Sequence, residues 1–150
     1  MHGYTRHNRA AASYRDALQT QTPAQQITQL YDHAILRLKE AKTAILEQRI
    51  EDRFQAVMKA FTILQGLQSC LDFERGGTIA PMLDGYYNHA MNRMLQINQR
   101  NDPSICDELV DYLVPMRASW AQIAQGSAGG VGRTPPPVEP HPRSVTSLVT

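Results

Sequence analysis

The 150-residue chain has few cysteines and no long hydrophobic run. Its two cysteines, Cys70 and Cys106, form no Cys-x-x-Cys motif, which argues against a zinc knuckle or a redox pair and is typical of small thiols in a reducing cytoplasm. No eighteen consecutive residues are apolar, and the first residues lack the apolar core of a secretory leader. We therefore expect a cytoplasmic (cytosolic) protein with no membrane insertion.

The sequence also lacks an excess of charge of either sign. Fifteen Lys and Arg stand against fourteen Asp and Glu, so the formal net charge is +1. A nucleic-acid binder normally carries a basic stripe or a high isoelectric point. This balance predicts no nucleic-acid partner, and a partner that is not held mainly by long-range charge.

Recognisable catalytic and metal-binding patterns are missing as well. None of the five histidines follows a Glu by three residues, as an inward-facing di-metal site in a helical bundle requires. No serine sits in a glycine elbow, and Gly76-Gly77 follows a helical pattern and not a strand, so this pair is a turn and not a phosphate cradle. We expect no enzyme activity, no metal and no cofactor.

Glycine and proline are unevenly distributed. Half of the nine Gly and nine Pro fall in the last twenty-five residues, where charges are few and apolar periodicity is absent. Such a composition predicts a disordered tail over 126–150. Residues 1–20 are polar and are expected to be a flexible N-terminal segment, so a folded domain is predicted over 21–125.

Helical patterns fill that domain. Thr22-Pro23-Ala24-Gln25 supplies a cap, a proline at the first helical position and a glutamine three residues after the cap. Further helices are expected from near Asp52 to Gly76-Gly77, from Ile79 after a Thr78 cap, and from Pro103 with a kink at Pro115. No segment alternates like a strand. The prediction is all-α: an antiparallel four-helix bundle, with or without a short extra N-terminal helix.

Two of these helices carry more apolar surface than one core-facing stripe requires. The second helix has one seam through Val57, Phe61 and Leu64, and a second stripe beside it. The third helix is also broadly apolar and rich in methionine, a residue that adapts to partners. These patterns leave two interpretations open: a groove for an amphipathic segment, or surface that is simply core or a homodimer contact.

Several short motifs, in order, resemble the flagellin export chaperone family, FliS. The similarity rests on Tyr14, then Thr20-Gln21-Thr22-Pro23, Leu30-Tyr31-Asp32, Leu71-Asp72-Phe73-Glu74-Arg75-Gly76-Gly77-Thr78-Ile79-Ala80, Tyr87, Arg93, Asn98, Asn101-Asp102 and Arg117-Ala118-Ser119-Trp120. Each piece alone is weak, but together they cover residues 14 to about 123.

The resemblance implies a cytoplasmic flagellar secretion chaperone. Such a protein binds the C-terminal segment of flagellin, prevents its premature polymerisation and delivers it to the flagellar type III export gate. It also implies a lid, because in the family the segment before the first long helix can lie over the client groove. Here that segment contains Tyr14, Leu18, Thr20 and Pro23.

The client groove is placed on the second apolar stripe and part of the neighbouring helix. Its predicted residues are Ala56, Ala60, Ile63, Leu67, Cys70, Tyr87, Met91 and Met94. The free protein is expected to be a monomer or a weak homodimer. The alternative is a structural bundle that uses this same apolar face for self-association.

Overall fold

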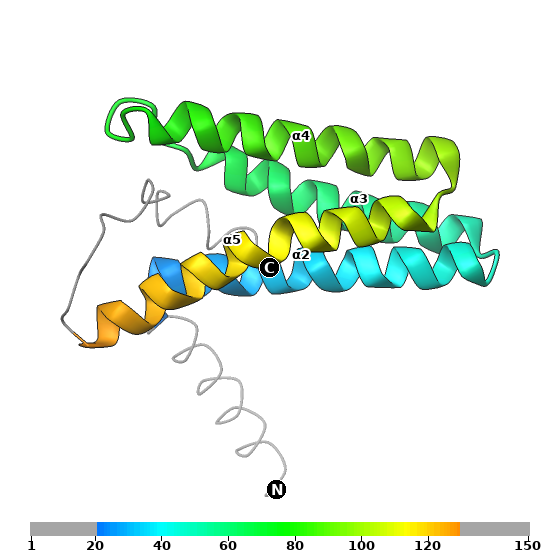
Figure 1. Cartoon of the computed structure of the whole chain (residues 1–150), viewed down its shortest axis with the longest axis horizontal. Helices are drawn as coiled ribbons and strands as arrows, with labels where there is room; N and C mark the ends of the chain where they lie inside the picture. Colours follow the sequence, from blue (N-terminus) through cyan, green and yellow to red (C-terminus); the bar gives the residue numbers. More distant parts are fainter. Residues whose placement is uncertain (1–20, 130–150) are drawn as a thin grey trace, which may run out of the picture.

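The computed structural model describes residues 21–129, which form four helices and no strand (Figure 1). They are α2 (Pro23–Leu46), α3 (Ile50–Ser69), α4 (Ile79–Arg100) and α5 (Pro103–Gly129). The predicted all-α bundle is confirmed. The short extra N-terminal helix, and the predicted tail beyond residue 129, were expected in parts of the chain outside the described residues.

Each helix packs against two neighbours. α2 contacts α3 and α5, and α4 contacts the same two helices from the other side. Short connections make successive helices antiparallel, as Figure 1 shows. The inward faces close one core, whose largest fully buried aliphatic side chains are Ile27, Leu30, Leu38, Val57, Leu64, Leu83, Met94, Ile97, Leu109 and Leu113. None of the described helices is long and apolar enough to cross a bilayer.

The start of α2 is fixed by the capping box that the sequence predicts. The Thr22 hydroxyl accepts a hydrogen bond from the backbone N–H of Gln25 at 3.2 Å, and the Gln25 side chain accepts one from the backbone N–H of Thr22 at 2.9 Å. Pro23 occupies the first helical turn, where its missing N–H costs nothing. Two free donors at the helix end are thereby satisfied.

Two of the turns contain a residue other than glycine in the left-handed backbone conformation. Gln48, between α2 and α3, has φ of 59°, and Asn101, between α4 and α5, has φ of 52°. The Asn101 side-chain oxygen accepts a hydrogen bond from the buried Arg53 at 2.6 Å, which joins this turn to the start of α3. Asp102 then caps α5 by accepting from the N–H of Ser104 at 2.9 Å, and the Ser104 bonds lower the pKa of that carboxyl.

The connection before α4 differs from the prediction. α3 ends at Ser69 and does not continue to Gly76-Gly77. Beyond it, the Asp72 carboxylate accepts hydrogen bonds from the N–H groups of Glu74 and Arg75, which holds the chain in a local turn in place of helix. Gly77 has φ of +51°, a conformation that suits glycine.

Thr78 is at the cap position of α4, as expected, but it does not cap the helix through its side chain. Thr78 precedes α4 in a helical conformation, and its side chain makes no capping hydrogen bond. The first N–H of the helix, from Ile79, instead donates to the backbone carbonyl of Gly76 at 3.0 Å. A backbone turn therefore replaces the side-chain cap.

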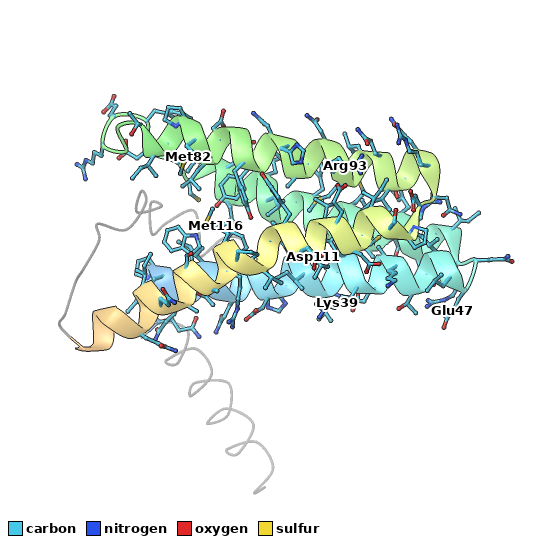
Figure 2. The ribbon with its side chains drawn as sticks, in the orientation of Figure 1. Lys39, Glu47, Met82, Arg93, Asp111 and Met116 are labelled. Atoms are coloured by element: carbon cyan, nitrogen blue, oxygen red, sulfur yellow. The ribbon has the colours of Figure 1, made fainter. Side chains whose placement is uncertain are left out.

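α5 is longer than the sequence predicts. It runs through Pro115 without ending and reaches Gly129, four residues into the segment assigned to the tail. Its second half lies beside α2 and diverges from α4 (Figure 1, and with side chains Figure 2). An ion pair between Arg117 of α5 and Asp32 of α2, 2.8 Å, lies in this half and joins the two helices.

A pair of buried tyrosines meets in the middle of the bundle. The hydroxyl of Tyr31, on α2, donates to the hydroxyl of Tyr87, on α4, at 3.0 Å, although these two helices are not direct neighbours. Both side chains are almost completely buried. Desolvation raises the pKa of both, that of Tyr87 to about 12.

This burial predicts alkaline instability. An unfolded tyrosine ionises near pH ~10, whereas folded Tyr87 holds its proton to about pH 12. Its contribution to stability is complete below pH ~10 and is lost as the pH rises toward 12, at about 1.4 kcal/mol per pH unit for each such proton. We expect urea unfolding, repeated at about four pH values from about pH 8 to about pH 11.5, to show a free energy of unfolding that falls as the pH rises.

The variant Tyr87→Phe isolates the effect. It should be less stable at neutral pH, because the Tyr31 hydroxyl loses its hydrogen bond to Tyr87. Above pH ~10, however, its free energy of unfolding should fall less steeply with pH, by the contribution of about one proton. Equal slopes for the two proteins would show that Tyr87 does not titrate as its burial requires.

Candidate functional site

Most of the predicted groove residues lie in the core. Seven of the eight are buried, each at most 7% exposed: Ala56, Ala60, Leu67, Cys70, Tyr87, Met91 and Met94. This stripe is therefore not open surface in the structure, and its role in client binding stays a prediction. The physical reason is the position of α3 between α2 and α4, which requires two adjacent faces of α3 to be apolar.

Ile63 is the member of that set that reaches the surface. It is partly buried and lines a cavity of about 660 Å³ between α2 and α3. This volume lies within the usual range of ligand sites, ~300–1,000 Å³. We call this cavity the α2–α3 groove.

Both walls of the α2–α3 groove are helical. The α2 wall consists of Gln29, Leu30, His33 and Arg37, and the α3 wall of Phe54, Gln55, Met58, Lys59, Thr62 and Ile63. The residues recur at steps of three and four along each helix, so each wall is one continuous helix face. Because the inner faces of both helices are fixed in the core, the groove is held open by the fold.

Four of the ten residues that line the groove are apolar: Leu30 on α2, and Phe54, Met58 and Ile63 on α3. Leu30 is buried at its base, whereas Phe54 is 52% exposed although it is a large aromatic residue. Met58 and Ile63 are partly exposed on the same helix. Exposed apolar side chains gathered around a cavity are typical of a surface that binds a partner.

Two further cavities adjoin the groove. One, of about 520 Å³, shares Gln55 and Lys59 with the groove and continues toward the α2–α3 turn. The other, of about 550 Å³, shares Gln29 and lies between α2 and α5, where its lining is mostly polar. The Asp32–Arg117 ion pair borders the cavity between α2 and α5, and the hydrogen bonds that Arg117 donates to Asp32 raise the pKa of its guanidinium. The hollowed surface therefore extends along α2.

The described residues place no metal-binding cluster in the groove. Among residues 21–129, no group of three or more His, Cys, Asp or Glu is placed to hold a metal ion. Burial raises the pKa of the Cys106 thiol to about 11, so that thiol stays protonated at neutral pH. The groove can bury apolar surface, form hydrogen bonds and pair with carboxylates through Arg37 and Lys59.

The predicted lid is mostly outside the described part of the chain. Tyr14, Leu18 and Thr20 lie there, and their role stays a prediction. Pro23 is the first residue of α2 and belongs to the bundle.

The sequence reasoning did not single out the main apolar side chains of the groove. Phe54 and Met58, one helical turn apart, fall outside both stripes of α3. They form an apolar pair at positions i and i+4 beside those stripes, and such a pair on a helix that already has two stripes was the available signal in the sequence.

Comparison with known proteins identifies the family of the chain. The family model described as "Flagellar protein FliS" matches residues 6–127, most of the chain. The chain belongs to the FliS family. It is 33% identical to the flagellar secretion chaperone FliS of Vibrio cholerae over 106 residues, which cover 71% of this chain and 78% of that protein.

Two other members of the FliS family are similarly close. The flagellar secretion chaperone FliS of Salmonella typhimurium is 33% identical over 116 residues, which cover 77% of this chain and 86% of that protein. The flagellar secretion chaperone FliSB of Pseudomonas aeruginosa is 32% identical over 102 residues, which cover 68% of this chain and 81% of that protein. The family is one of chaperones, which are not enzymes.

A pair of charge substitutions tests the assignment of core and surface. Leu67→Glu places a carboxylate where the side chain is 3% exposed and should cost about 4 kcal/mol or more, enough to unfold the bundle. Phe54→Glu should change the free energy of unfolding by no more than about 1 kcal/mol, because that side chain is half exposed. Circular dichroism during urea unfolding measures both; a folded Leu67→Glu protein would contradict the assignment.

Proposed function

We propose that this FliS-family protein is a chaperone that binds the C-terminal segment of flagellin in the α2–α3 groove. In the cytosol, binding there prevents premature polymerisation of flagellin, and the chaperone delivers its client to the flagellar type III export apparatus. The observation that supports this location is the groove itself, with Phe54 exposed and Met58 and Ile63 partly exposed around it. Membership of a family of flagellar secretion chaperones supports the client.

The recognition mode that suits the groove is a helix in a groove. The terminal segments of flagellin form amphipathic helices that would otherwise assemble with one another, so the chaperone must offer competing apolar surface. An amphipathic helix presents apolar side chains on one face, which can enter a groove between two helices. Burial contributes about 25 cal/mol per Å² of apolar surface, against which stands the cost of ordering the client.

Methionine and phenylalanine suit this task for different reasons. Phe54 supplies a large rigid contact area, and unbranched Met58 can adjust to side chains of different shape. Leu30 is buried below them and is fixed by the core. A rigid base with adaptable sides lowers the cost of binding because only the sides need to be reordered.

A calorimetric titration with a peptide of the organism's own flagellin C-terminal segment tests the proposal. We expect saturable 1:1 binding to the unchanged protein. Phe54→Glu should weaken this binding about tenfold, because a carboxylate replaces the largest apolar contact in the groove. Absence of binding to the unchanged protein would refute the client assignment.

Phe73→Glu is the matched control. Phe73 is 56% exposed, close to the exposure of Phe54, but it lies in the connection between α3 and α4 and does not line the groove. Its affinity should change by less than about twofold. Equal losses for the two variants would place the client elsewhere on the bundle.

Self-association over the same surface is the competing use of the groove. Light scattering of the free protein separates the two: a monomer that shifts in mass only when the peptide is added fits a chaperone. A constitutive dimer, dispersed by Phe54→Glu, would show that the groove covers a second copy of the chain.

A further inference from the structure

We propose that the α2–α3 groove selects helices whose apolar face is flanked by carboxylates. The inference rests on the proposed client-binding role of the groove and adds the chemistry by which a client is chosen. It is carried by the charges along the two walls.

The walls of the groove are cationic and contain no acid. Arg37 on α2 and Lys59 on α3 are positively charged, and His33 lies one turn before Arg37. Every other lining residue is neutral. A helix seated between the walls would have its two flanks facing Arg37 and Lys59, so acidic residues on both flanks would be matched and basic residues repelled.

The two cations are in different states. A nitrogen of Arg37 is 2.8 Å from a carboxylate oxygen of Glu40, an ion pair between residues three apart that fixes the guanidinium at the rim. Lys59 is exposed and has no ion pair or hydrogen bond within residues 21–129. Lys59 is therefore the cation that a client carboxylate would gain as an unshared partner.

Charge makes the chain's own terminal segments weaker occupants of the groove than a helix with acidic flanks. Residues 1–20 contain three arginines and one aspartate, and residues 130–150 contain two arginines and one glutamate. Both segments thus carry a net positive charge, the same sign as the groove walls. Each has a single acidic side chain, so neither offers carboxylates on both flanks of a helix.

A second copy of the chain is disfavoured for a related reason. A two-fold symmetric contact places the same surface of each copy against the other. Groove would then face groove, and Lys59 and Arg37 would approach the same cations of the partner copy. A separate helix with acidic flanks avoids this repulsion.

Three designed amphipathic peptides test the selection directly. They share one leucine face and differ only in the flanking residues, which are Glu, Gln or Lys, and their binding is followed by fluorescence anisotropy. At low salt the Glu-flanked peptide should bind the unchanged protein about tenfold more tightly than the Gln-flanked one, and the Lys-flanked peptide most weakly. Raising the salt should remove most of the difference, because exposed ion pairs are screened.

Lys59→Gln should lower the affinity for the Glu-flanked peptide about threefold and leave the Gln-flanked peptide unchanged. Lys42→Gln is the control: it removes the same charge from the side of α2 that faces α5, where Lys42 bonds Asp107 at 2.9 Å. That variant should behave like the unchanged protein with all three peptides. Equal affinity for the three peptides, or equal effects of the two substitutions, would overturn the inference.

The flagellin peptide separates this inference from the proposed function. A flagellin peptide that binds with no response to salt or to Lys59→Gln would refute the charge selection alone. A flagellin peptide that does not bind, with the Glu-flanked peptide still preferred, would refute the client and leave the selection standing.

Discussion

α3 has to bury apolar side chains against two neighbours at once, and this constraint decides where the protein can offer a binding surface. α2 covers one side of α3 and α4 the other. That packing buries Ala60, Leu64 and Leu67, so these side chains cannot contact a partner. Only the outer edge of α3, where Phe54 and Met58 lie, remains available to a partner. The groove is therefore a by-product of how the core is closed.

The core also explains why the groove is preformed. Tyr31 lies one residue after Leu30, the base of the groove, and its hydroxyl is bonded to Tyr87 on the far helix. The capping box at Thr22 and the Arg53–Asn101 hydrogen bond fix the start of α2 and of α3. A groove whose walls are held in this way needs little reordering when a client enters, and less binding energy is lost.

Net charge and local charge give different information about recognition. The near-neutral chain predicts weak long-range attraction, and that expectation is compatible with a cationic groove because opposite charges elsewhere cancel in the sum. Glu40 beside Arg37 is an example of such local cancellation. Among the described residues, Lys59 has no such neighbouring acid in an ion pair. Because the net charge of the chain is small, Lys59 acts mainly at contact distance, where it contributes to the choice between clients more than to their long-range attraction.

The sequence by itself determined the helices, because caps, prolines and the three-four spacing of apolar residues act within a few residues of one another. It placed the starts of α2 and α5 closely, and it placed the end of α3 wrongly because the Asp72 turn competes with helix through local hydrogen bonds. Which apolar stripes are core and which face is open was decided only by the tertiary structure. Periodicity gives the direction in which a side chain leaves its helix, but burial depends on which other helix arrives there, and that is how Leu67 became core and Phe54 became the edge of a groove.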